Sequence, residues 1–305
     1  MTDPQARTGN AFPAAPPASP PHSTSTTEPL IQFQSPQVWT ELNVSEDDDD
    51  SALGDDSASS TESLASSIRK YRVLNGRTYH HNQDETHYWG PNDDRQNNTL
   101  DLGSGRALLS IQMDDFTKPW MFDDNSFDYV HLRWLVGSVE NWTDLFKEAY
   151  RVLKPGGYIE TFDLDGNITS DDGTVTEKTA ISQWGFIFQE GARKLGSRAS
   201  YNPIGEGLQH RALVDAGFAN ITEKPFKLPT SEWHDDPILH EAGQFSRATI
   251  MNDIEGFIGM MATQLGWTTE EISVYSAHLR RELRSLKIHA YFNVCAAYAQ
   301  KPVDV

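Results

Sequence analysis

The residues with the clearest capacity for chemistry lie in the stretch TLDLGSGRALLSIQMDD, residues 99–115. A strand-like Leu-Asp-Leu run ends there in Gly103-Ser104-Gly105. Glycine lets the backbone of such a turn approach a nucleotide-type cofactor at a point where a side chain would collide. Asp101, inside the run, could orient this loop. The same pattern also fits an ordinary turn, with Asp101 as a solvated helix residue, so Gly103 and Gly105 are candidate cofactor contacts on a short motif.

The spacing after this loop does not match a complete cofactor domain. Dinucleotide-type folds place the acid that holds the ribose hydroxyls ~20 residues beyond the glycine loop. Here eight residues, 106–113, separate Gly105 from the acidic pair Asp114-Asp115. A βαβ unit takes ~30 residues, so a helix, a second strand and another helix do not fit. The sequence therefore predicts a sheet that is shortened at its first strands.

One histidine lies near the end of a predicted strand in FDYVHLRWLV, residues 127–136. His131 is a candidate base for a substrate hydroxyl, because open α/β sheets bind ligands at the carboxyl ends of their strands. A structural histidine at the rim of the sheet fits the position equally well. The 10 histidines of the chain show no HExxH-type spacing, and we expect no catalytic metal.

The elements that must position these residues are clearest from residue 127 to residue 164. The β-forming run at 127–136 is followed by NWTDLFKEAYRVLK, whose apolar residues recur at helical spacing. Pro155-Gly156-Gly157 stops that helix and permits a tight reversal into the apolar YIETFDL. A strand, a helix and a strand in this order indicate a βαβ unit and a parallel sheet.

The remainder divides into four predicted parts. Residues 67–102 read as lead-in helices and 103–230 as the core of the sheet. Residues 231–288 read as an inserted helical cap, and 289–303 as an aromatic and apolar last strand, for which a helix is the alternative.

Residues 1–66 have a different composition, rich in Pro, Ser, Thr, Ala and Asp, with eleven acids and the single base Arg7. Such a segment cannot bury enough apolar surface to offset the entropy of ordering, so we predict a disordered acidic tail. Its one apolar patch, IQFQSPQVW, is a possible short contact motif. The tail is either an inert solubilising extension or a regulatory docking arm.

Charge and cysteine content exclude several classes of function. The net charge of −19 argues against direct nucleic-acid binding, since phosphate contacts need a basic surface. The single cysteine, Cys295, excludes an internal disulfide and indicates a reducing compartment. No apolar signal region follows Met1, and no apolar run reaches the ~20 residues that span a bilayer. We expect an intracellular protein with no membrane contact.

Four segments together resemble the LaeA-like fungal methyltransferases, a family with the class I S-adenosylmethionine-dependent methyltransferase fold. The resemblance covers residues 67–305 and extends to the last strand, IHAYFNVCAAYAQKP. Its most specific part is RVLKPGG within the predicted βαβ unit. The four segments are NGRTYH (75–80), YWGPNDDRQNNTLDL (88–102), DDFTKPWMFDDNSFDYVHLR (114–133) and GSVENWTDLFKEAYRVLKPGGYIE (137–160).

The resemblance implies an α/β fold: a Rossmann-like doubly wound sheet, truncated here at its first strands, with an antiparallel last strand and inserted C-terminal helices. It implies S-adenosylmethionine as cofactor, held by Asp101, Gly103 and Gly105 and by a turn at Asp114 and Asp115, with Asp115 and Phe116 beside the adenine. The resemblance also implies a small-molecule acceptor, velvet-type regulatory partners and a cytoplasmic or nuclear location.

Two interpretations of the glycine loop remain open, and three functions of the chain remain open with them. Either Gly103–Gly105 is a working loop, or Leu100–Leu102 ends a lead-in helix and the glycines are a remnant where the first strands are absent. The chain is accordingly a methyltransferase of fungal secondary metabolism, a non-catalytic regulator or scaffold with the same fold, or a mis-spliced product. None of these three functions involves metal catalysis or direct nucleic-acid binding.

Overall fold

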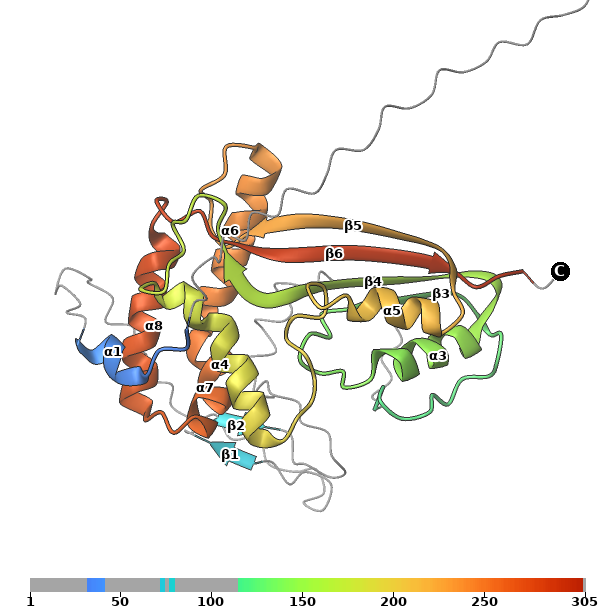
Figure 1. Cartoon of the computed structure of the whole chain (residues 1–305), viewed down its shortest axis with the longest axis horizontal. Coiled ribbons are helices and arrows are strands. Elements are labelled where there is room, and N and C mark those ends of the chain that lie inside the picture. The colour runs from blue at the N-terminus through green and yellow to red at the C-terminus, as the bar shows by residue number, and fades with distance from the viewer. Residues whose placement is uncertain (1–31, 42–71, 75–76, 80–114, 304–305) are drawn as a thin grey trace, which may run out of the picture. The chain divides into compact units, whose positions relative to one another are not determined.

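The computed structural model describes residues 32–41, 72–74, 77–79 and 115–303 (Figure 1). Its main sheet has four strands in the order β3-β4-β6-β5. β3 is parallel to β4, and β6 lies antiparallel between β4 and β5. The predicted last strand is thereby confirmed as an antiparallel strand. The strands are β3 (Phe127–Arg133), β4 (Leu153–Thr169), β5 (Ala219–Pro229) and β6 (Tyr291–Gln300).

The predicted strand-helix-strand unit is confirmed, with α3 (Trp142–Val152) between β3 and β4. Asn141 caps the helix by accepting from the Asp144 backbone N–H at 3.2 Å. The turn after α3 needs glycine twice. Gly156 has a φ of +82°, and a Cβ on Gly157 would lie 2.9 Å from the Lys154 carbonyl oxygen.

One face of the sheet packs on α3 and α5 (Leu208–Asp215). The apolar side of α3 is buried there because its apolar residues recur every three or four positions. Ile159 on β4 and Ala297 and Ala299 on β6 meet this side. The buried residues of α3 are Trp142, Leu145, Phe146, Ala149 and Val152.

A helical layer adjoins the carboxyl ends of β4 and β5. Three of its helices, α6 (Pro237–Asn252), α7 (Ile254–Gln264) and α8 (Thr269–Arg284), lie within residues 231–288, where inserted helices were predicted. The fourth, α4 (Ala180–Leu195), lies in the segment predicted as the core of the sheet. Glu282 of α8 accepts from the Ala180 and Ile181 backbone N–H groups, both at 2.8 Å, and so caps the start of α4.

The lead-in region differs from the predicted helices at residues 72–79. β1 (Arg72–Leu74) and β2 (Arg77–Tyr79) form an antiparallel pair in which Leu74 is opposite Arg77. That register leaves two residues between the strands, and the sequence there is Asn-Gly, the strongest short hairpin signal. Local turn chemistry therefore overrides the helical reading.

The tail also differs from the prediction, at residues 32–41. This segment contains α1 (Pro36–Glu41), and Trp39 is only 1% exposed. The apolar patch IQFQSPQVW supplies enough buried surface to order a short stretch inside an otherwise polar composition. The other residues of the 1–66 tail lie outside the described part of the chain.

Candidate functional site

β3, β4 and β5 run in the same direction, so their carboxyl ends point to one side of the sheet. β3 ends at Arg133, opposite Phe162 of β4, whereas β4 and β5 continue to Thr169 and Pro229, which lie opposite Tyr291 at the start of β6. Open α/β sheets bind their ligands outside the carboxyl ends of the strands. The residues at and near these strand ends are therefore the candidates for a functional site.

Asp163 of β4 organises the exit from β3. Its carboxylate is fully buried and accepts from the backbone N–H groups of Leu135 at 3.0 Å and Val136 at 3.2 Å. It also accepts from its neighbour Leu164 at 2.9 Å. Burial raises the pKa of Asp163 to about 7, although these N–H groups act in the opposite direction. Because its acceptors are engaged by backbone, Asp163 positions the loop.

Asp165, two residues on, plays the same part for the segment before α5. It is 5% exposed and accepts from the backbone N–H groups of Ile204 at 2.9 Å and Gly205 at 3.0 Å. Burial raises its pKa as well. Alternate residues of a strand point to one face, so both carboxylates lie on the α5 side. Together they fix two loops at the carboxyl edge.

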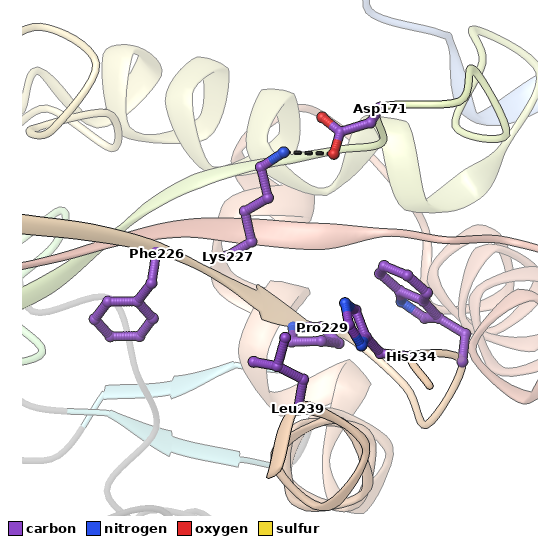
Figure 2. A pocket seen from close by; sticks show the side chains of 7 residues that line it. Asp171, Phe226, Lys227, Pro229, His234 and Leu239 are labelled. Atoms are coloured by element: carbon purple, nitrogen blue, oxygen red, sulfur yellow. Dashed lines mark hydrogen bonds and ion pairs between the residues drawn. The ribbon is translucent and has the colours of Figure 1, made fainter. Parts of the chain in front are cut away.

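A cavity of about 410 Å³ opens at the end of β5 (Figure 2). An ion pair between Lys227 and Asp171 lies on one side of it. The Tyr291 hydroxyl donates to Asp171 at 2.7 Å, and the Lys227 ammonium lies 4.6 Å from the centre of the Tyr291 ring. The lining residues are Asp171, Phe226, Lys227, Pro229, Trp233, His234 and Leu239.

The opposite wall is aromatic. The Trp233 ring lies 4.9 Å from that of His289 and 5.1 Å from that of His234, centre to centre. Its Nε1–H donates to the Ala290 carbonyl at 2.9 Å, which fixes the ring plane. His234 Nδ1 accepts from the Asp236 N–H at 3.0 Å, so the imidazole carries its proton on Nε2. The cavity thus offers flat apolar walls beside one ion pair, which suits a planar organic molecule with a polar substituent.

His131 lies on β3, two residues before the strand ends. Its side chain is 38% exposed, and Nδ1 is 3.3 Å from a Glu160 carboxylate oxygen. The ring is also stacked with Tyr129, with centres 6.2 Å apart. Val130 and Leu132 pack toward the α3 side, so the alternate residue His131 points to the other face. Its role as a base stays a prediction.

The candidate cofactor residues are only partly within the described chain. Asp101, Gly103, Gly105 and Asp114 lie outside it. Asp115 begins a turn in which its Oδ1 accepts from the Thr117 N–H at 3.0 Å and hydroxyl at 2.6 Å.

Phe116 follows Asp115 and is half-buried against the cluster formed by α3 and α5. Its carbonyl accepts from Trp120 Nε1 at 3.0 Å, so the turn holds a carboxylate beside an anchored aromatic residue.

Several site residues were not predicted from the sequence. Asp163 and Asp165 alternate in FDLDG at the end of a strand, which is a usable signal for inward-facing groups at the carboxyl edge. Trp233 and His234 carry no periodic signal, because they come together with Lys227 only through the fold.

Residues 32–41, 72–74, 77–79 and 115–303 contain neither a metal-binding cluster nor a membrane-spanning helix. No group of three or more His, Cys, Asp or Glu side chains there is arranged to hold a metal ion. No helix in that part of the chain combines the length and the hydropathy needed to cross a bilayer.

Comparison with known proteins identifies relatives over most of the chain. The family profile described as a methyltransferase domain matches residues 93–161. "Methyltransferase pytC" of Aspergillus terreus is 27% identical over 306 residues, covering 81% of this chain and 93% of that protein. "Probable methyltransferase tdiE" of Emericella nidulans is 30% identical, covering 72% of this chain and 67% of the relative. "Secondary metabolism regulator LAE1" of Cochliobolus heterostrophus is 30% identical, with 62% of this chain matching 61% of its length.

The match to pytC also measures a length difference. It extends over 306 positions, whereas 81% of the 305 residues of this chain is about 247 residues. About 59 of the aligned positions therefore have no residue from this chain. The βαβ unit, the antiparallel last strand and these relatives agree. The chain belongs to the LaeA-like fungal methyltransferase family.

Proposed function

We propose that the protein is an S-adenosylmethionine-dependent methyltransferase that acts on a small molecule in fungal secondary metabolism. The observation that carries this proposal is the sheet order β3-β4-β6-β5, with an antiparallel β6 and an aromatic cavity at its carboxyl edge. The relatives named as methyltransferases support it. An intracellular location, cytoplasmic or nuclear, goes with this role.

The residues present fit the adenosine end of the cofactor. Asp115 and Phe116 place a carboxylate beside an aromatic ring, and an adenine can use the first for its amine and the second for stacking. The methionine end would fall to Asp101, Gly103 and Gly105. When bound, S-adenosylmethionine supplies an activated sulfonium methyl group, so the protein has mainly to position the acceptor.

The cavity at the end of β5 is a proposed site for a planar small molecule. Trp233 and Phe226 would cover the faces of this molecule, and the His234 Nε2–H would donate to one of its oxygens. The Lys227–Asp171 pair would orient a polar substituent at the rim. His131 lies on β3, at the edge of the sheet where the cofactor would bind, and is the candidate base for the hydroxyl of the methyl acceptor.

Calorimetric titration of the full chain with S-adenosylmethionine and with S-adenosylhomocysteine tests the proposal. We expect measurable heat for both, and weaker binding in Phe116→Ala. Asp128→Asn is the matched control, because this carboxylate is 83% exposed and pairs with Lys154 on the surface. If the folded wild-type chain gives neither heat nor a thermal shift with either ligand, it is not a methyltransferase.

The shortened chain favours a second candidate function, a non-catalytic regulator or scaffold. Only eight residues separate Gly105 from Asp114, and about 59 positions of the alignment with pytC have no residue from this chain, which leaves little room for the first strands. Such a regulator would act through partners, and the family resemblance points to velvet-type proteins. Pull-down from fungal extract tests this, and retention of no velvet-type protein by the full chain would exclude that form of it.

Sequencing the transcript across codons 98–114 addresses the length difference directly. Extra codons numbering roughly two βα units, at ~30 residues for each βαβ, would restore a complete cofactor domain and favour the enzyme. A transcript that matches the present chain would favour the regulator.

A further inference from the structure

We propose that residues 32–41, the tail segment, are a tethered peptide ligand that packs against residues of α4 and α8, a contact surface called the groove below. The groove is lined by Gln183 of α4, by Trp267, and by Tyr275 and His278 of α8. The tail segment is separated from the next described residue, Arg72, by thirty residues of acidic, polar sequence. It therefore enters the fold as a distinct piece of chain.

Two aromatic anchors hold the tail segment. The Trp39 ring meets the Tyr275 ring edge-on, with centres 5.6 Å apart, and lies 5.9 Å from the His278 ring. The Phe33 ring lies 6.5 Å from that of Trp267. Trp39 is 1% exposed, and burial of a tryptophan is among the largest single contributions an interface residue makes.

Two buried polar side chains of the groove find partners on the backbone of the tail segment. Gln183 is fully buried; its Oε1 accepts from the Gln34 N–H at 2.7 Å, and its Nε2 donates to the Gln32 carbonyl at 3.2 Å. The Gln183 amide thus bonds to one backbone N–H and one backbone carbonyl of the tail segment, as a neighbouring strand would. This combination of main-chain hydrogen bonds and aromatic anchors is typical of peptide recognition.

His278 completes the recognition at the other end. Its ring is 1% exposed, and Arg281 donates to its Nδ1 at 2.8 Å. Arginine is always a donor, so the proton of the imidazole is on Nε2, which donates to the Trp39 carbonyl at 3.0 Å.

The fit is incomplete in a way that suits release. Trp39 Nε1 is buried without a hydrogen-bond partner among the described residues, and such a group weakens binding. The tail segment is therefore a ligand held mainly by its rings and backbone.

The groove is connected to the cavity at the end of β5. The Tyr275 hydroxyl donates to the Ala180 carbonyl at 2.9 Å, and Glu282 accepts from the Ala180 N–H at 2.8 Å. Residues 170–179 directly precede Ala180 and carry Asp171, which lines the cavity. Release of the tail segment is therefore expected to loosen this wall.

A fluorescently labelled peptide of residues 31–42 provides the test, with full-length chains as receptors. In the wild-type chain the groove is filled in cis, where a tethered ligand has an effective concentration on the order of millimolar. We expect the Trp39→Ala chain to bind the peptide at least about tenfold more tightly than the wild type. The Thr40→Ala chain is the control, since the exposed Thr40 hydroxyl donates to Gln37 within the segment.

Hydrogen exchange supplies a second measurement. Residues 170–184 and 275–282 should exchange faster in Trp39→Ala than in the wild type or Thr40→Ala. A peptide that itself carries Trp39→Ala should not bind.

Equal peptide affinity for folded Trp39→Ala and wild-type chains would overturn the proposal. Should Trp39→Ala fail to fold, the milder Phe33→Ala chain takes its place. Unfolding of both chains would show that the tail segment is an integral part of the core, which also refutes it.

Discussion

Asp163 should make the stability of the fold depend on pH. Burial raises the pKa of this carboxyl from its ordinary value of 3.8 to about 7 in the folded chain, whereas the unfolded chain keeps the ordinary value. Between these values the unfolded state has released a proton that the folded state retains. Stability is therefore greatest below pH 4 as far as this group is concerned, falls as the pH rises, and levels off above 7.

The size of the effect follows from the two pKa values. Each pH unit within the window costs about 1.4 kcal/mol, so the full window from 3.8 to about 7 amounts to ~4 kcal/mol. Between pH 5 and pH 8 the expected loss is ~2–3 kcal/mol, because part of the window lies below pH 5. Asp163→Asn removes the ionisation. Its amide Nδ2 would oppose the Leu135 or the Val136 N–H, a cost that does not vary with pH and so cancels in the comparison.

Urea denaturation at pH 5, 6, 7 and 8, followed by tryptophan fluorescence, measures this difference. The free energy of unfolding of Asp163→Asn should rise by ~2–3 kcal/mol relative to wild type between pH 5 and pH 8. Asp128→Asn, at an exposed carboxylate, should follow the wild-type curve. Parallel curves for wild type and Asp163→Asn would show that burial does not dominate at this carboxyl, and would refute the reasoning.

Two further predictions concern the packing of the helical layer. Arg77→Ala removes the two guanidinium contacts, at 2.7 and 2.8 Å, to the fully buried Asp253, and should lower the free energy of unfolding by ~3–5 kcal/mol in urea denaturation; an unchanged midpoint would contradict this. Gly191→Ala would place a Cβ 2.6 Å from that of Met261, so calorimetry should show a loss of ~1–3 kcal/mol despite the better helix propensity of alanine. A gain in melting temperature would mean that α4 and α7 can separate without cost.

The parts of the fold that the sequence predicts are those determined by local pattern. The βαβ unit is legible because α3 repeats its apolar residues at helical spacing and because Gly156 and Gly157 are needed for the turn that follows. The last strand is predictable from its apolar and aromatic content. A helix was the alternative, and the pairing of β6 with β4 on one side and with β5 on the other shows that it is a strand.

The parts that sequence reasoning missed depend on contacts between distant residues. Trp39 is ordered by Tyr275 and His278, more than two hundred residues away, so a composition argument assigns it to a disordered tail. The hairpin at 72–79 was open to prediction from the Asn-Gly pair in its sequence, but residues 67–102 were interpreted as lead-in helices. The cavity combines residues from β5, from the loop after β4 and from the loop before α6, and no local pattern encodes that meeting.

The choice between enzyme and regulator turns on one position in the sheet. In a doubly wound fold of order 3-2-1-4-5-6, the first strand lies beside the fourth, and β3 occupies the place of the fourth. Among the described residues β3 pairs only with β4, so its other edge is where a first strand carrying Gly103–Gly105 would have to pair. The cavity at the end of β5 lies at the opposite edge of the sheet, beyond β4 and β6. A chain that lost its first strands could therefore keep the cavity intact while losing the cofactor, which is why cofactor binding, and not the integrity of the cavity, separates the two functions.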